Sequence, residues 1–103
     1  GKTMKALILV DIQKDFCKNG ALEVKDGDMI VPIANKMIDF FKEKGDMVIG
    51  TKDWHPSSHK SFAVNSNGKI GEVGELNGLP QVWWPVHCVQ NENGSKFHAE
   101  LHQ

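Results

Sequence analysis

The chain has 103 residues, 40% of them hydrophobic and 24% charged, and its twelve basic residues oppose thirteen acidic ones. This composition excludes a disordered tail and allows one globular domain at most. A net charge of −1 gives no reason to expect nucleic acid or a membrane surface as a partner. The longest apolar runs, ALILV and MIVPIA, are too short to cross a bilayer. Two cysteines and the lack of a signal-peptide pattern predict a reduced, cytoplasmic protein.

The first half of the chain predicts a strand, a helix and a second strand. Residues 5–10 form an apolar run that is typical of a strand buried on both faces of a parallel sheet. Residues 29–44 show helical spacing, with Asp28 suited to cap the start and Gly45 to end it. Residues 46–50 supply the second strand, so the two strands should be parallel. The helical spacing predicts a main apolar stripe, with further apolar residues flanking it. The stripe comprises Ile30, Ile33, Met37 and Phe41, and the flanking residues are Ala34, Ile38 and Phe40.

The second half predicts little regular structure. Residues 56–92 are rich in Gly, Asn, Ser and Pro without a clear period, and a loop this long is usually functional. A helix is expected from Ser95, with Phe97 and Leu101 on one face. This helix should lead to a third strand, because two strands cannot make a sheet covered on both faces. We therefore expect residues 1–103 to be the N-terminal part of a doubly wound α/β domain, incomplete in this chain.

Two carboxylates are expected at the carboxyl ends of the strands, where ligands bind in open parallel sheets. Asp11 follows the first strand and Asp53 the second, so both should reach one crevice. A carboxylate there can act as general base or metal ligand, or it can cap the next loop.

A metal site is the second hypothesis for this edge. Asp53 and His55 alternate on an extended segment and point the same way, and His87 is a candidate third ligand from the long loop. One carboxylate and two imidazoles suit Zn²⁺, Fe²⁺ or Mn²⁺ and leave positions open for substrate. His59 is a further candidate ligand. Position alone favours ordinary loop polarity over a site.

Other polar and aromatic side chains have two interpretations each. His98 and His102 stand at helical spacing, and an exposed helix face is favoured over a metal site. Cys88 adjoins His87, but neighbours in extended chain point apart, so a small buried hydrophobe is favoured for Cys88 and for Cys17. The loop aromatics suggest either a pocket for a flat ring or residues folded onto the core; they are Phe16, Trp54, Trp83 and Trp84.

Three stretches carry a resemblance to a known family. LILVDIQKDFCKNGAL, TKDWHPSSHKSF and WPVHCVQNENGSKFH resemble the N-terminal half of nicotinamidases, also called pyrazinamidases, within the isochorismatase-like cysteine hydrolases. The D-x-Q-x-D-F opening is shared across the superfamily. The combination of D-W-H-P with W-P-x-H-C-V is more specific, because it belongs to the metal-binding nicotinamidases. The resemblance covers Lys5 to Gln103 and implies a six-stranded parallel sheet with helices on both faces.

The resemblance implies a role for each matching position. Asp11 matches the catalytic aspartate that carries the proton from the nucleophile to departing ammonia. The metal ligands are matched by Asp53, His55 and His87, and His59 stands where some members have a fourth ligand. The residues around the pyridine ring are matched by Phe16, Leu22 and Trp84. Gln13 and Asp15 complete the opening motif in supporting roles.

The chain departs from the family in one respect. The family triad also needs a lysine after the third strand and a cysteine nucleophile at a later helix, and neither Lys96 nor Cys88 matches them. The implied reaction of the complete enzyme is hydrolysis of nicotinamide to nicotinate and ammonia in NAD salvage through a thioester. This chain alone is therefore expected to be inactive, and its partner is the C-terminal part of the enzyme or a second copy.

Two alternatives stay open on sequence alone. Two histidines and one carboxylate also form the triad of non-haem iron oxygenases, which usually lie on β-barrels. A metal-binding piece without activity, whose exposed sheet needs a second chain, is the other alternative.

Overall fold

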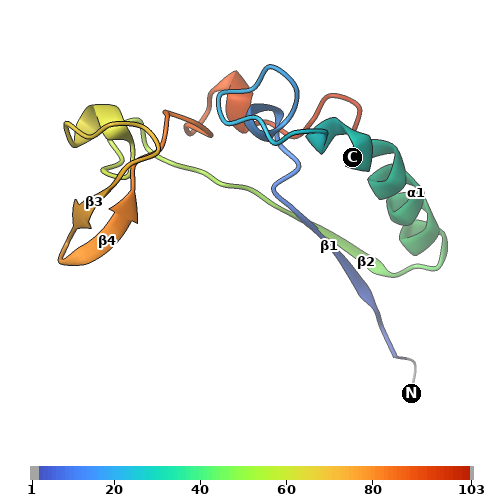
Figure 1. Cartoon of the computed structure of the whole chain (residues 1–103). Coiled ribbons are helices and arrows are strands. Elements are labelled where there is room, and N and C mark those ends of the chain that lie inside the picture. Colours follow the sequence, from blue (N-terminus) through green and yellow to red (C-terminus); the bar gives the residue numbers. More distant parts are fainter. Residues whose placement is uncertain (1–2, 103) are drawn as a thin grey trace.

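A parallel strand pair joined by a helix forms one end of the molecule. The structure, a computed structural model, describes residues 3–102. Strand β1 (Ala6–Val10) pairs in parallel with β2 (Met47–Thr51), with Leu7 opposite Val48, and helix α1 (Ile30–Glu43) connects them (Figure 1). The strand, helix and strand expected from the sequence are confirmed.

The sheet is covered on one face only. Leu9 of β1 is 9% exposed, whereas Ile8 and Val10 on the opposite face are 58% and 65% exposed. The expected burial of this strand on both faces is wrong for this chain, because α1 and the C-terminal segment cover the same side of the pair. The core on that side comprises Leu9, Ile12, Val31, Ala34, Ile38 and Leu101, with Leu7, Val48 and Phe97 packed against it.

Helix α1 packs through Val31 and through two of the expected flanking residues, and not through the main stripe. Its buried residues are Val31, Ala34 and Ile38. The expected stripe is largely exposed: Ile30, Ile33 and Met37 are 49%, 64% and 41% exposed. The helix carries apolar side chains on more than one face, so periodicity identifies a helix but does not say which stripe meets β1.

The ends of α1 are only partly as expected. Met29 is the N-cap residue and makes no side-chain cap, whereas Asp28 accepts a hydrogen bond from the Lys18 amide at 2.6 Å. The capping role expected of Asp28 is therefore wrong. Gly45 follows the helix at φ +74°, the left-handed conformation that ends many helices, as expected.

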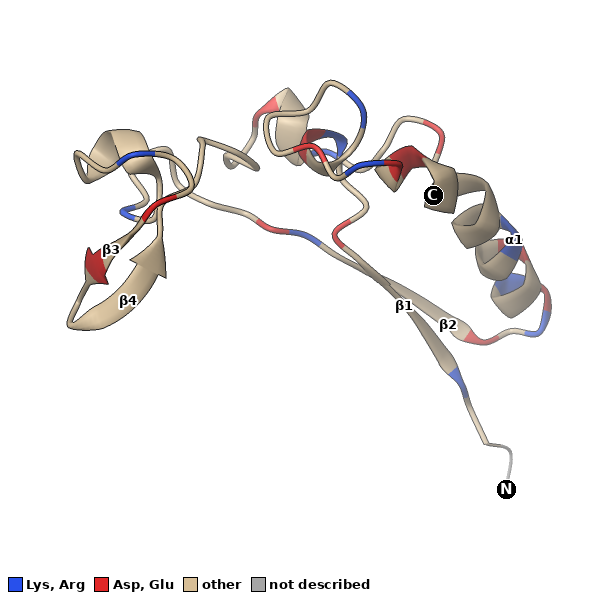
Figure 2. Ribbon diagram, in the orientation of Figure 1, with Lys and Arg blue, Asp and Glu red and all other residues tan. Residues whose placement is uncertain are grey.

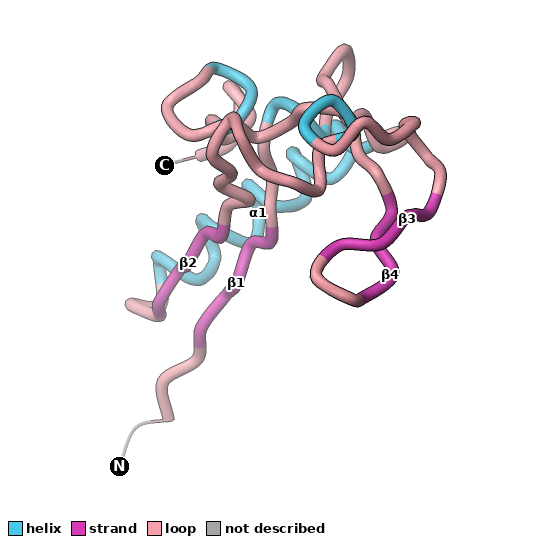
Figure 3. Tube along the Cα trace, turned by 90° about the vertical axis from the view of Figure 1, so that its left-hand side faces the viewer, coloured by secondary structure: helices cyan, strands magenta, loops and turns pink. Residues whose placement is uncertain are grey.

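A β-hairpin lies within the stretch expected to be irregular. Strands β3 (Val73–Leu76) and β4 (Leu79–Val82) are antiparallel, and Asn77 and Gly78 between them have φ of +52° and +81°. Asn-Gly between two strands is a strong hairpin signal that the expectation overlooked. The hairpin stands apart from β1 and β2 (Figure 3).

The C-terminal segment is extended and irregular, and the helix expected from Ser95 is wrong. A 3₁₀ turn, η4 (Asn93–Ser95), precedes it. The Lys14 amide then donates to the Lys96 carbonyl and the His98 amide to the Ile12 carbonyl, both at 2.9 Å. This pairing with the segment after β1 satisfies backbone groups that a helix would have satisfied internally.

Short 3₁₀ turns and an elongated outline complete the architecture. The turns are η1 (Lys14–Phe16), η2 (Gly27–Met29) and η3 (Ala63–Asn65). The radius of gyration is 16.6 Å, against about 13 Å for a compact domain of about 100 residues. Basic and acidic residues are interspersed along the ribbon (Figure 2).

Within residues 3–102, no helix is long and apolar enough to span a membrane.

Candidate metal centre

Asp53, His55 and His87 converge as the sequence predicts. The Oδ2 atom of Asp53 lies 3.5 Å from Nε2 of His55 and 3.7 Å from Nε2 of His87. One ligand atom from each residue lies within 4.8 Å of the other two. Two ligand atoms that share a tetrahedral Zn²⁺ at about 2.1 Å are themselves about 3.4 Å apart. The spacing therefore fits an ion shared by the three side chains.

Backbone pairing brings the two ligand segments together. The His55 amide donates to the Cys88 carbonyl at 2.9 Å, and the Gln90 amide donates to the His55 carbonyl at 2.8 Å. This isolated parallel bridge joins the stretch after β2 to the stretch that contains His87. The long loop thus returns one ligand to the other two.

Gln13 fixes the backbone of the carboxylate ligand. Its side chain is fully buried, and its Oε1 atom accepts a hydrogen bond from the Asp53 amide at 2.9 Å. Its Nε2 atom donates to the carbonyls of Asp53, at 2.9 Å, and Ser95, at 2.8 Å. One amide therefore holds Asp53 to the segment that follows β1.

Asp15 performs the same task for the other ligand segment. Its Oδ2 atom accepts a hydrogen bond from the Cys88 amide at 2.7 Å, and its Oδ1 atom accepts one from the Ala21 amide at 3.2 Å. Cys88 has φ +49°, so this bond holds a conformation that non-glycine residues rarely adopt. A Cβ atom on Gly94 would collide with the Asp15 carboxylate, so a larger residue there would displace the carboxylate from its hydrogen bonds.

Hydrogen bonds at Nδ1 show which histidines offer a lone pair. His87 Nδ1 lies 2.7 Å from the Pro85 carbonyl, which only accepts, so the proton is on Nδ1 and Nε2 is free to bind a metal. His59 has the opposite tautomer. Its Nδ1 accepts a hydrogen bond from the Ser61 amide at 3.1 Å, so the proton of the neutral ring is on Nε2. His59 is also outside the group of ligand atoms that lie within 4.8 Å.

The three ligands open onto a cavity of about 380 Å³. The side chains that the sequence assigns to the ring pocket line the same cavity: Phe16, Leu22 and Trp84. Gln81 from β4 and Ser61 also line it, and sequence reasoning missed both. Gln81 was missed because the hairpin was not recognised. Flat apolar walls beside a polar end suit an aromatic ring that carries a heteroatom.

Asp11 stands at the end of β1, but not on this cavity. It lines a neighbouring cavity of about 450 Å³, and Phe16 is shared by the two. The Thr51 hydroxyl donates to Asp11 Oδ1 at 2.9 Å, and Asp11 has φ +55°. The single crevice expected for Asp11 and Asp53 is therefore two adjoining cavities.

Both cysteines are free and buried, as expected. Burial raises the pKa of the Cys88 thiol to about 12, and the Asp15, Asp53 and Asp11 carboxylates add to the rise. Burial also raises the pKa of Cys17, with a further contribution from Asp28. Neither thiol is prepared to act as a nucleophile.

The tryptophans divide between the two interpretations. Trp83 is buried, and its indole packs against Gly68 and Gly74, so it belongs to the core of the hairpin. Trp54 is 43% exposed, with the Lys52 ammonium 5.6 Å from its ring centre. Among these three, only Trp84 lines the cavity of the metal ligands.

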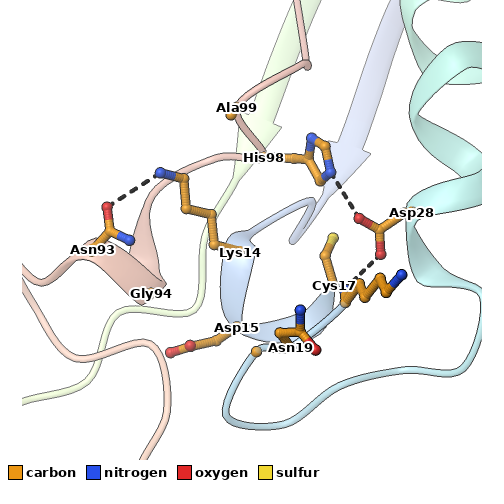
Figure 4. Close-up of a pocket in the computed structure, with 11 residues that line it drawn as sticks. Lys14, Asp15, Cys17, Asn19, Asp28, Asn93, Gly94, His98 and Ala99 are labelled. Atoms are coloured by element: carbon orange, nitrogen blue, oxygen red, sulfur yellow. Dashed lines mark hydrogen bonds and ion pairs between the residues drawn. The ribbon is translucent and has the colours of Figure 1, made fainter.

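A second group of metal-ligand types lies elsewhere, at Cys17, Asp28 and His98 (Figure 4). His98 Nδ1 accepts the Glu100 amide at 3.0 Å, so Nε2 carries the proton and donates to Asp28 Oδ2 at 2.9 Å. This is a hydrogen-bonded pair, and its Nε2 has no lone pair left for a metal. His102 pairs similarly with Asp39 at 3.0 Å. The helix expected beneath His98 and His102 is wrong, whereas His102 is exposed as expected.

Comparison with known proteins agrees with this arrangement. Residues 5–103 match the Isochorismatase domain family. The chain belongs to this family. It is 50% identical over 99 residues to the nicotinamidase of Escherichia coli (strain K12), covering 96% of this chain and 46% of that protein. The nicotinamidase/pyrazinamidase of Mycobacterium tuberculosis is 34% identical over 95% of this chain and 46% of its own length.

Solved structures give the same result. An Acinetobacter baumanii nicotinamidase superposes with a TM-score of 0.84 at 41% identity. The superposition covers 95% of this chain and 46% of the Acinetobacter baumanii chain. A Pyrococcus horikoshii pyrazinamidase in complex with zinc superposes with a TM-score of 0.74 at 43% identity, with the same coverage. The chain thus spans about half the length of the relatives it matches, and corresponds to part of an isochorismatase-like domain.

Proposed function

We propose that this chain supplies the metal centre and the ring pocket of a nicotinamidase, which hydrolyses nicotinamide and pyrazinamide-like amides to the acid and ammonia. The observation that carries the proposal is the single cavity that joins two imidazoles and a carboxylate to three apolar walls. The identity to nicotinamidases supports the substrate class. We assign the reaction to NAD salvage on the same grounds.

We propose that Asp53, His55 and His87 hold a divalent metal, with Zn²⁺ first and Fe²⁺ or Mn²⁺ as alternatives. The donor set suits all three ions, and the zinc in the Pyrococcus horikoshii relative supports the first. A bound ion would act as a Lewis acid toward the ring nitrogen of the substrate. Phe16, Leu22 and Trp84 would then hold the ring and exclude water beside the carboxamide.

We propose that Asp11 moves the proton of the family's cysteine nucleophile, which the resemblance places beyond these 103 residues. The carboxylate takes the thiol proton and later gives it to departing ammonia. The Thr51 hydroxyl fixes one of its oxygens, which keeps the carboxyl group aimed while its protonation changes.

We further propose that the C-terminal half of the enzyme covers the open face of β1 and β2. The exposed apolar side chains Ile8 and Val10 support this occupant, because uncovered strands otherwise self-associate. A second copy of the chain is the alternative occupant. A cytoplasmic location stays a prediction, supported by two unpaired cysteines.

A chimera tests the proposed function. Residues 1–103 would be joined to the C-terminal half of the Escherichia coli nicotinamidase, and ammonia release from nicotinamide would be measured. We expect turnover by the chimera, none by residues 1–103 alone, and loss of activity in the Asp11→Ala and His55→Ala chimeras. A folded, metal-loaded chimera that leaves nicotinamide intact would refute the proposal.

A further inference from the structure

His59 lines the metal cavity and, among the described residues, its side chain makes hydrogen bonds through Nδ1 only. Its ring centre lies 4.9 Å from that of His55, and its side chain lines the cavity with the three ligands. The Ser61 amide and hydroxyl, at 3.1 Å and 2.7 Å, both face its Nδ1 atom. The amide can only donate, so the neutral ring carries its proton on Nε2.

The Nε2 atom of His59 has no hydrogen-bond partner among residues 3–102. No buried side-chain nitrogen or oxygen in that part of the chain lacks a partner, so this atom reaches solvent. Ser61 itself is buried. If the proton of the His59 ring were on Nδ1, the Ser61 amide would have no acceptor and would be left unsatisfied. The tautomer is therefore fixed by a backbone group that has no other acceptor.

We propose that His59 is not a ligand but donates its Nε2–H to the molecule that occupies the open coordination position of the metal. This inference rests on the proposed metal centre. The three ligands leave at least one position for water, an anion or a substrate atom. A fixed donor beside that position strengthens the binding of electron-rich ligands without adding to the affinity for the ion itself.

Metal content separates a donor from a ligand. The chain would be loaded with Co²⁺, and bound metal would be measured for wild type, His59→Ala and His55→Ala. We expect one ion per chain in wild type and in His59→Ala, and a large loss in His55→Ala. Loss of bound metal in His59→Ala would show that His59 is a ligand and would overturn the proposal. A wild-type chain that takes up no metal would refute the metal centre, and the role of His59 with it.

Anion affinity then tests the donor role directly. Azide would be titrated into the Co²⁺-loaded proteins at neutral pH and followed by the visible spectrum. We expect His59→Ala to bind azide about tenfold more weakly than wild type, because the variant loses one hydrogen bond to a charged ligand. His59→Gln keeps an N–H of similar reach and should retain most of the affinity, and His102→Ala serves as a control. Equal azide affinity in wild type and His59→Ala, with metal retained, would overturn the proposal.

Discussion

Among the described residues, two groups of three potential metal ligands each bring a carboxylate within 4 Å of an imidazole, but only one is arranged for a metal. At Asp28 and His98 the two atoms are 2.9 Å apart, with a proton between them. At Asp53 the two imidazole nitrogens are 3.5 and 3.7 Å away, the spacing that a shared ion needs. Each place has an aspartate and a histidine, with Cys17 as the third group in one and a second histidine in the other. The backbone group at Nδ1, a carbonyl for His87 and an amide for His98, decides which nitrogen is free.

The largest expected effect tests whether these regions differ as described. His55→Ala should weaken Zn²⁺ binding by more than about a hundredfold. Mutation of residues that only hydrogen-bond to metal ligands already lowers metal affinity by about 10 to 100-fold, and loss of a ligand should lower it further. His98→Ala should leave the affinity unchanged. Calorimetric titration with Zn²⁺ measures both. Equal losses in the two variants would mean that the Cys17 group also binds metal.

A smaller effect is expected from the residue that supports the metal centre without touching it. Gln13→Leu removes the partners of the Asp53 amide and of two carbonyls. We expect the free energy of unfolding to fall by about 3 kcal/mol, from unsatisfied buried groups. Metal affinity should fall by about 10 to 100-fold. Urea unfolding and Zn²⁺ titration provide the measurements.

Gln90→Leu is the matched control for Gln13→Leu. The side-chain amide of Gln90 makes one exposed hydrogen bond, 3.5 Å long, to the Trp54 carbonyl. Its removal should change the free energy of unfolding by no more than about 0.5 kcal/mol. If Gln13→Leu behaved like this control, Gln13 would not hold the site together.

The smallest effect concerns the Asp28 region and its response to acid. The amide of Lys18 lowers the pKa of Asp28, and the hydrogen bond from His98 lowers it further. A carboxyl group whose pKa is lower in the folded state stabilises the protein above its unfolded value, about 3.9, and loses this contribution as pH falls through the folded value. Unfolding followed from pH 6 to pH 2 should therefore show wild type and Asp28→Asn converging in acid. A constant difference between them would contradict the assignment.

The sequence predicted the parts of the fold that local pattern determines. A continuous apolar run, a helical period and a second run specified β1, α1 and β2, and D-x-H after β2 specified two candidate ligands that the structure brings together. The structure adds that His87 joins them through a backbone bridge at His55, which no local pattern encodes. The resemblance gave Gln13 and Asp15 supporting roles. The groups that they hold could not be predicted, because these partners lie 40 and 73 residues away.

The errors have physical causes of three kinds. The main stripe expected for α1 is exposed because apolar residues surround the helix, and its packing against the strands selects which of them are buried. The hairpin was missed because its strands are only four residues each and lie within a stretch rich in Gly, Asn, Ser and Pro, where the Asn77-Gly78 turn signal does not stand out. The final helix was wrong because Phe97 and Leu101 reach the core from extended chain, where Phe97 packs over Gly50.

The buried amide of Gln13 has a consequence for genetics. A scan of all substitutions, scored by enzyme function, would mark this position as sharply as the ligands, although Gln13 makes no contact with the proposed ion or ring. Chemical rescue would tell the two classes apart. Excess metal should restore function to a weakened support residue, whereas a missing ligand should respond far less.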